Sequence, residues 1–356
     1  MQYDVIIVGA GPAGVSAALE FARTNVRVLV IEKESLPREK PCGGAMPSSV
    51  EKLLGIDISK VVKNRTHLLK MYNNYKDEVT SKTSGMDAPV LINRREFDMF
   101  LLEQAIFIGR KNIELIDKCR VISVNETGNE VCILLESGKK IKANYLIAAD
   151  GALGKIASKI GLMKKRKFAQ SFDAEIITTN RYYENHKNTM LMNYFCLPHG
   201  YGWIFPKEKN RFSCGVGRWG KPIDIKEALN DFIKKSFPSG VIESIKITGY
   251  PIPVYNGTQQ ISTNKILLTG DAAALVDPVS GEGIRFALHS GKVAASVIIK
   301  SLRRDIESPD IGVSKTYEKE VNEKIGKELK LKLSFASLAF HSNAQMFYKT
   351  FVNKPY

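Results

Sequence analysis

The sequence predicts a mixed α/β fold, α+β overall, with a largely parallel sheet, an inserted antiparallel sheet and C-terminal helices. Near the N-terminus, the apolar run Val5–Val8 lacks alternation, as in strands that are buried on both faces of a parallel sheet. From about Phe168 the chain changes to short strands between turn residues, which is typical of an antiparallel sheet. At Lys265 the buried-strand pattern returns, and a long helical stretch follows it.

Three glycines follow the first strand with GxGxxG spacing, Gly9, Gly11 and Gly14. In a strand–turn–helix unit the first permits the tight turn, the second lets a pyrophosphate approach the backbone, and the third lets helix and strand pack closely. The N–H groups at the start of the helix suit an anion. The next strand ends at Glu32, about 20 residues on, where a carboxylate accepts from a ribose hydroxyl. The combination predicts a dinucleotide site, and a glycine-rich turn without a ligand is the alternative.

Length and composition are those of a globular protein with room for two domains, with 356 residues of which 44% are hydrophobic. No apolar run is long enough to span a membrane and no secretory signal is recognisable. The five cysteines lack a CxxC pair, so we expect neither a disulfide framework nor a metal site, as in a reducing cytosol. The net charge of +15 favours anionic partners or simply solubility, and no nucleic-acid-binding motif is recognisable.

Five motifs occur in order along the chain: GAGPAG at 9–14, KPCGGA at 40–45, NRREFD at 93–98, AADG at 148–151 with YGWIFPK at 201–207, and GDAAALVDPVSGEGI at 270–284. With them, the chain from Tyr3 to about residue 300 resembles the geranylgeranyl reductase family, FAD-dependent enzymes related to the para-hydroxybenzoate hydroxylase superfamily. The first and last motifs belong to the wider flavin superfamily. KPCGGA and YGWIFPK have a narrower distribution among flavin enzymes and point to the reductases.

The resemblance implies a Rossmann-like FAD-binding domain. Gly9, Gly11 and Gly14 would cradle the FAD pyrophosphate, and Glu32 would hold the adenosine ribose. Arg94 would place a cation near the phosphates or the ribityl chain, with an ordinary surface cation as the alternative.

Further cofactor contacts are implied in the same way. Val121 would present its backbone to the adenine, and Asp271 would accept from a ribityl hydroxyl unless it only caps a helix. Gly283 and Ile284 begin a helix whose N–H groups would stabilise negative charge on the reduced flavin. The remaining cofactor-binding candidates are Pro12, Ala13, Lys33, Cys42, Gly43, Gly44, Ala45, Asp150, Gly151, Pro278 and Gly281.

The candidate catalytic residues are Cys42, Tyr201 and Trp203. The resemblance places Cys42 near flavin and substrate without defining its chemical role, and a small buried residue is the alternative. Tyr201, Trp203 and Phe205 fall on one face of a strand, where they would line a cavity for an apolar chain or form part of a sheet core. Met190, Met192 and Tyr194 repeat the spacing.

The implied reaction is reduction of carbon–carbon double bonds in a geranylgeranyl-type chain on a lipid, a diphosphate or a quinone. Aromatic faces such as those of Tyr201 and Trp203 would stabilise positive charge on the prenyl carbon, and the proton donor stays open. No second GxGxxG is present for a separate NAD(P)H-binding domain. Electrons would therefore come from transiently bound NAD(P)H or from ferredoxin or another carrier. A flavin monooxygenase or halogenase is the competing enzyme class, and a non-enzymatic FAD-holding sensor is a third hypothesis.

Along the chain we expect a discontinuous FAD-binding domain (1–70, 90–167 and 256–305), a substrate-binding domain (71–89 and 168–255) and a C-terminal helical segment (306–356). That segment alternates lysine with apolar residues in 327–340 and continues with Met346, Phe347 and Phe351. It would lie on an anionic membrane or pack on the FAD-binding domain. We expect a cytoplasmic protein, with peripheral attachment to the inner face of the cell membrane as the variant, and the oligomeric state stays open.

Overall fold

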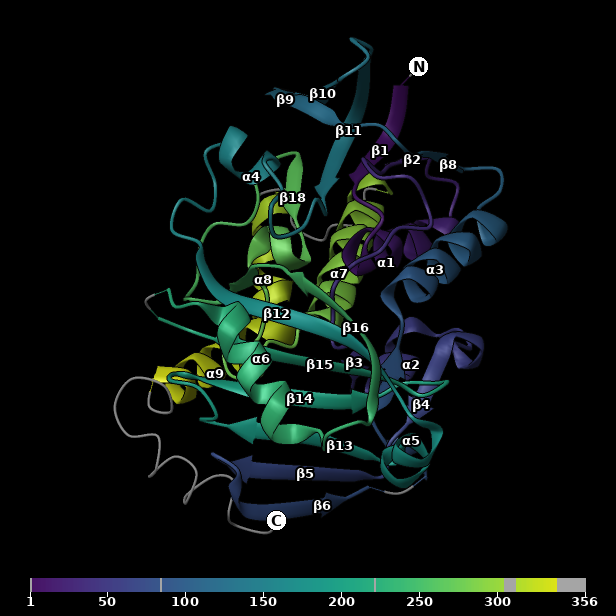
Figure 1. Ribbon diagram of the computed structural model, residues 1–356. Coiled ribbons are helices and arrows are strands. Elements are labelled where there is room, and N and C mark those ends of the chain that lie inside the picture. The colour runs from purple at the N-terminus through teal and green to yellow at the C-terminus, as the bar shows by residue number, and fades with distance from the viewer. Residues whose placement is uncertain (1, 84, 221, 304–311, 338–356) are drawn as a thin grey trace. The chain divides into compact units, whose positions relative to one another are not determined.

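The computed structural model describes residues 2–83, 85–220, 222–303 and 312–337 (Figure 1). The chain divides into two compact units. The first unit comprises Met1–Arg38, Asp98–Lys167 and Pro253–Lys332, and the second comprises Glu39–Phe97, Phe168–Ile252 and Leu333–Tyr356.

The first unit contains the expected parallel sheet. Its strands follow the order β8-β2-β1-β11-β10-β9, and β18 pairs with β11. The parallel strands are β1 (Gln2–Val8), β2 (Val28–Ile31), β8 (Ile113–Ile116), β11 (Lys140–Ala148) and β18 (Ile266–Leu268). Val5, Ile6 and Ile7 are fully buried, which confirms a first strand that is covered on both faces. The sequence alternates in Val121–Val124 and Val131–Leu135 around Thr127-Gly128-Asn129, which predicts a hairpin. The structure confirms it, formed by β9 (Val121–Thr127) and β10 (Glu130–Leu135).

Two helices of the first unit pack directly against each other, α1 (Pro12–Ala22) and α7 (Ile284–Leu302) (Figure 1). Their close approach needs a glycine, because a Cβ atom at Gly291 would lie 2.0 Å from the carbonyl oxygen of Ala13. The other helical elements here are α3 (Arg94–Ile108, in this unit from Asp98 on), α4 (Ile156–Lys159), η3 (Gly270–Ala273), α8 (Val313–Val321), the π-helical η4 (Asn322–Gly326) and α9 (Lys327–Ser337, in this unit up to Lys332).

The second unit is built on a sheet with the order β16-β12-β15-β14-β13-β5-β6. These strands are β16 (Ile242–Gly249), β12 (Lys167–Thr178), β15 (Arg211–Arg218), β14 (Gly200–Pro206), β13 (Thr189–Tyr194), β5 (Leu68–Asn73) and β6 (Lys76–Lys82). Neighbours in this order are antiparallel, as expected, except for β13 and β5, which are parallel. This parallel pair differs from the expectation, because β5 comes from a much earlier segment and does not reach β13 through a hairpin.

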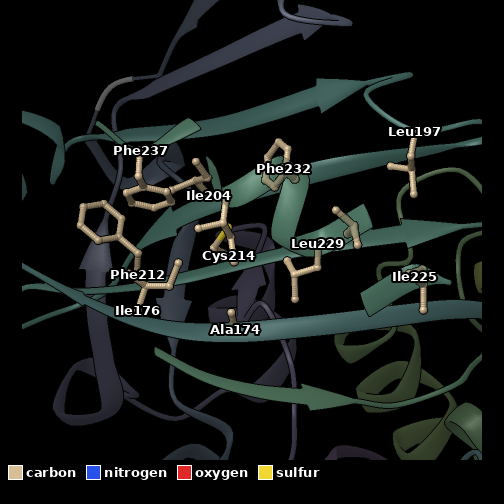
Figure 2. Packing of buried hydrophobic residues seen from close by; sticks show 12 residues of the cluster. Ala174, Ile176, Leu197, Ile204, Phe212, Cys214, Ile225, Leu229, Phe232 and Phe237 are labelled. Atoms are coloured by element: carbon tan, nitrogen blue, oxygen red, sulfur yellow. The ribbon is translucent and has the colours of Figure 1, made fainter. Parts of the chain in front are cut away.

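One face of this sheet is covered by α6 (Ile225–Ser236), whose apolar side chains point onto the strands (Figure 2). Asp224 caps the helix by accepting from the backbone N–H groups of Lys226 and Glu227. The ring of Phe232 lies over Gly202 of β14, where an added Cβ would come within 2.5 Å of it. The buried cluster comprises Ala174, Ile176, Leu197, Ile204, Phe212, Cys214, Val216, Ile225, Leu229, Phe232, Ile233 and Phe237.

A small antiparallel sheet in the second unit orders the segment after Cys42. Its strands are β3 (Ala45–Met46), β7 (Val90–Ile92) and β4 (Val62–Arg65). The remaining short elements are α2 (Ser49–Leu54), η1 (Ser59–Val61), η2 (Gly85–Asp87), α5 (Asn180–His186) and β17 (Ile252–Val254, in this unit only Ile252).

Candidate functional site

The turn into α1 is closed by backbone contacts that only glycine permits. Gly9 has a φ of +107°, and a Cβ atom there would lie 2.2 Å from the carbonyl oxygen of Ala149. A Cβ atom at Gly14 would lie 1.9 Å from the carbonyl oxygen of Gly9. The N-cap residue Gly11 brings no side chain to the helix start. The first N–H groups of α1 are therefore left for an anion, as a pyrophosphate site requires.

Glu32 lies directly after β2, and its carboxylate is almost fully buried. It accepts from the backbone N–H of Ala10 at 2.9 Å and of Glu34 at 3.1 Å, and Arg38 Nε lies 3.3 Å away. Arg38 also pairs with the buried Asp98 at 3.4 Å. A carboxylate has about four acceptor positions, so Glu32 keeps one for a ribose hydroxyl.

The late motif lies at the start of α7. A Cβ atom at Gly270 would lie 3.1 Å from the Cβ of Ala13 and 3.0 Å from that of Ala287, so three distant segments converge there. Asp271 lies beside the N-cap of α7, because a Cβ at Gly283 would lie 3.5 Å from its Oδ1. No hydrogen bond or ion pair engages the Asp271 carboxylate within the part of the chain that the structure describes. A free acceptor beside a helix start that lacks a side-chain cap fits a polyhydroxyl chain.

Asp150 provides a second acceptor in the first unit. Its Oδ2 accepts from the backbone N–H of Ile156 at 3.0 Å, whereas Oδ1 is buried and has no hydrogen-bond partner among the described residues. Burial raises the pKa of Asp150, and the Arg166 guanidinium opposes this shift. Buried polar atoms normally have partners, so the orphaned oxygen marks a place where a bound hydroxyl or N–H group would be satisfied.

The loop that leads into α7 is held by α9. The buried Asp277 accepts from Ser280 Oγ at 2.6 Å and from the backbone N–H of Val279 at 2.8 Å, and Lys332 Nζ of α9 lies 2.8 Å away. Arg285 pairs with Glu328 of α9 at 2.7 Å and holds the pKa of that carboxyl near 2, well below its usual range. The part of α9 up to Lys332 therefore packs within the first unit.

Membrane attachment through the C-terminal segment stays a prediction, since Met346, Phe347 and Phe351 lie outside the described residues. Across the described ranges, the structure contains no helix with the length and apolar character needed to cross a bilayer.

The second unit brings KPCGGA and YGWIFPK together. A Cβ atom at Gly43 would lie 3.2 Å from the ring of Phe205 and 3.3 Å from Trp203 Nε1. Lys207 Nζ, just after β14, donates to the carbonyl oxygen of Cys42 at 3.5 Å. The Cys42 segment therefore lies on the aromatic strand, and this packing explains why small residues follow the cysteine.

The expected aromatic face of β14 is present. The ring centroids of Tyr201 and Trp203 are 5.9 Å apart, and those of Trp203 and Phe205 are 6.3 Å apart. These rings pack with Leu91 and Met190 on one face of the sheet. Further contacts come from Ala45, Leu69, Met192, Tyr194 and Trp219.

Sequence reasoning missed two polar partners of this cluster. Trp203 Nε1 donates to Ser213 Oγ at 3.2 Å, and Ser213 donates to the carboxylate of Asp173 at 3.1 Å. Burial raises the pKa of Asp173 to about 6. Asp173 is one of several polar residues in its strand, so the sequence carries no signal that singles it out. Arg38 and Asp98 were missed in the first unit, although Asp98 closes the NRREFD motif.

Other predicted residues lie apart from these contacts. Lys33 is exposed, 3.9 Å from Glu34. Arg94 begins α3 and is half-buried, as is Val121 at the start of β9. Their roles toward FAD stay predictions.

Comparison with known proteins gives consistent matches over nearly the whole chain. The family described as FAD binding domain matches residues 2–320. An uncharacterized protein of Methanosarcina barkeri is 33% identical over 90% of this chain and 80% of its own. A digeranylgeranylglycerophospholipid reductase of Methanosarcina acetivorans is 29% identical over 93% of this chain and 83% of its own, and a menaquinone reductase of Mycobacterium tuberculosis is 29% identical over 83% and 76%.

Among solved structures, a geranylgeranyl bacteriochlorophyll reductase-like protein of Thermoplasma acidophilum aligns with a TM-score of 0.86 at 22% identity, covering 98% of this chain and 90% of its own. The fold and the glycine-lined helix starts define an FAD-binding protein of the oxidoreductase class. Within that class, the chain belongs to the FAD-binding domain family, and it is similar to proteins named as reductases of the geranylgeranyl type.

Proposed function

We propose that the protein reduces carbon–carbon double bonds of a geranylgeranyl-type prenyl chain carried by a lipid, a diphosphate or a quinone. One observation carries this proposal: the aromatic face of β14 packs against the Cys42 segment. This contact brings together KPCGGA and YGWIFPK, the two motifs that point most specifically to the reductases. Relatives named as reductases of a digeranylgeranyl phospholipid and of menaquinone support a prenylated substrate.

The first unit would hold FAD through residues already described. The N–H groups at the start of α1 would bind the pyrophosphate, the remaining acceptor position of Glu32 would take a ribose hydroxyl, and Asp271 would accept from the ribityl chain. The helix start at Gly283 would place positive partial charge near the flavin ring. When bound and reduced, FAD supplies hydride.

The second unit would supply the environment for the prenyl chain. Tyr201, Trp203 and Phe205 belong to a buried apolar cluster, which would exclude water from a prenyl chain packed against it. An isolated alkene accepts hydride only as it becomes protonated, so positive charge develops on its more substituted carbon. The faces of Tyr201 and Trp203 would stabilise this charge. Cys42 is a candidate to contact the reacting carbon.

Electron supply and cellular placement are further parts of the proposal. NAD(P)H or ferredoxin would reduce the flavin, and the net charge of +15 suits either a nicotinamide phosphate or an acidic carrier protein. The same charge supports work at the cytoplasmic face of an anionic membrane, where prenylated lipids and quinones are found.

A single-turnover experiment tests the reaction. The FAD-loaded protein is reduced with dithionite in the absence of oxygen and mixed with vesicles that contain a geranylgeranyl lipid or a menaquinone. We expect flavin reoxidation together with a product that is heavier by two hydrogens per bond reduced. Reoxidation that occurs only after oxygen is admitted, with an oxygenated or halogenated product, would instead establish the monooxygenase or halogenase alternative.

A further inference from the structure

A relay of hydrogen bonds crosses three neighbouring strands of the second unit. Trp203 of β14 donates its indole N–H to Ser213 of β15 at 3.2 Å. Ser213 donates to Asp173 of β12, 3.1 Å from Oδ1 and 3.3 Å from Oδ2. The indole reaches across because Gly215 stands between, where a Cβ atom would lie 2.1 Å from the ring. Gly215 thus leaves space for the indole ring of Trp203, which donates to Ser213.

Opposing influences around Asp173 set the pKa of its carboxyl. Burial raises its pKa to about 6, whereas the Lys207 ammonium, the Ser213 hydroxyl and the backbone N–H of Cys42 favour the ionised form. Glu175, on the same strand, opposes ionisation and is paired with Arg211 of β15 at 2.8 Å. On β16, the residue opposite Asp173 is the uncharged Thr248.

Asp173 is partly buried, and taking its carboxylate out of water costs free energy that an apolar side chain would not. Its presence at this position therefore points to a task. In this relay, the ionised carboxylate attracts the Ser213 proton and makes Ser213 Oγ a stronger acceptor for the indole N–H of Trp203. Hydrogen bonds in a chain polarise one another in this way. The polarised N–H leaves more electron density on the ring, and a richer ring attracts a cation over its face more strongly.

We propose that Asp173 and Ser213 are positioning residues of the reductase site, which orient and polarise the indole of Trp203 so that its face stabilises the positive charge developing on the prenyl carbon. This inference rests on the proposed function and deepens it, because it gives the partly buried Asp173 an electrostatic task rather than that of a proton donor.

The relay is tested without any substrate. In the full-length, FAD-loaded, 15N-labelled protein, the sequence provides two tryptophans, and Trp219→Phe leaves the Trp203 indole as the single signal. We expect its N–H chemical shift to titrate with a midpoint near pH 6, as the pKa of Asp173 requires. Asp173→Asn and Ser213→Ala abolish the titration. A flat indole signal in the parent protein would overturn the relay.

Glu175→Gln is the matched control. It removes a carboxylate from the same strand, but one that makes no hydrogen bond to Ser213. The indole titration should persist with its midpoint moved to lower pH, because one negative neighbour of Asp173 is gone. A titration that disappears in Glu175→Gln but survives in Ser213→Ala would contradict the assignment to Asp173.

Turnover gives the second readout. The rate of prenyl reduction should rise as pH increases through about 6, and both Asp173→Asn and Ser213→Ala should lower it about 5-fold above that pH, with KM unchanged. If the rate instead falls as pH increases through this range, in the parent protein and in Ser213→Ala alike, Asp173 is a proton donor. That result would overturn the positioning role. If the parent protein reduces no prenyl substrate, the proposed function fails, while the indole titration still decides whether the relay exists.

Discussion

The helix starts in the first unit and the surroundings of the Cys42 segment in the second unit differ in the atoms that make their close contacts. Around α1 and α7, the close contacts involve glycine, alanine and backbone carbonyl groups, as at Gly9, Gly14 and Gly270. Around Cys42, the contacts come from large or charged side chains such as Trp203 and Asp173. A site made of backbone tolerates no added atom, whereas a site made of side chains can be altered one group at a time. Substitutions should therefore separate cofactor binding from chemistry.

The largest effect is expected in the first unit. Gly14→Ala would place a Cβ 1.9 Å from the carbonyl oxygen of Gly9, so strand and helix must move apart. We expect loss of nearly all bound flavin and a fall of more than about 3 kcal/mol in the free energy of unfolding. Flavin absorbance relative to protein, with urea denaturation, measures both. Gly128→Ala is the control, because nothing lies within 4 Å of its added Cβ; equal losses in both variants would refute the backbone argument.

In the second unit, Asp173→Asn should stabilise the protein at neutral pH. An aspartate ionises at 3.8 when unfolded, but burial raises the pKa of Asp173 to about 6 in the folded chain. As pH rises between these two pKa values, Asp173 loses its proton in the unfolded chain but keeps it in the folded chain, so the free energy of unfolding falls. The full decrease, reached above pH 6, is about 3 kcal/mol. Urea denaturation should show the variant more stable by up to that amount at about pH 7, and equal to the parent near pH 4. A less stable variant at pH 7 would contradict the raised pKa.

Trp203→Leu should separate chemistry from cofactor binding. It keeps an apolar side chain but removes the ring face, which is worth about 2 kcal/mol when desolvated and therefore about 30-fold in rate. We expect this loss in prenyl reduction with the flavin content retained. Flavin absorbance and product mass spectrometry on the same preparation provide the comparison. If flavin content falls in proportion to turnover, Trp203 is a structural residue.

The smallest effect is expected at α9. Lys332→Met removes the ammonium beside the buried Asp277, which keeps its hydrogen bonds from Val279 and Ser280. Because Lys332 is itself partly exposed, we expect a loss of about 1 kcal/mol and weaker flavin retention. Lys324→Met is the control, since Lys324 pairs with Glu320 at the surface. Thermal denaturation with and without added FAD measures the difference, and identical behaviour of the two variants would remove the role of α9 in holding the loop.

The sequence predicted best what depends on local pattern. The buried strand Val5–Val8, the glycine turn and the hairpin of β9 and β10 were all visible as spacing, and the structure confirms them. The shared face of Tyr201 and Trp203 followed from the two-residue period of a strand.

What depends on the register between distant strands was not predictable. The parallel pairing of β13 with β5 joins segments that are far apart in sequence. The relay also needs the register of three strands, which places Asp173 opposite Gly215 and Gly215 opposite Trp203. Isolated polar residues such as Ser213 carry no local signal of such a role, and the contact of Arg38 with Asp98 likewise forms only in the fold.

Mass spectrometry of lipids and quinones from cells with and without the gene tests prenyl reduction by this protein most directly. We expect prenyl chains in cells lacking the gene to be lighter by two hydrogens for each bond that the enzyme reduces. The parent gene should restore the heavier species, whereas the Trp203→Leu variant should not. Identical prenyl masses in both cells would contradict the assignment of a prenyl reductase.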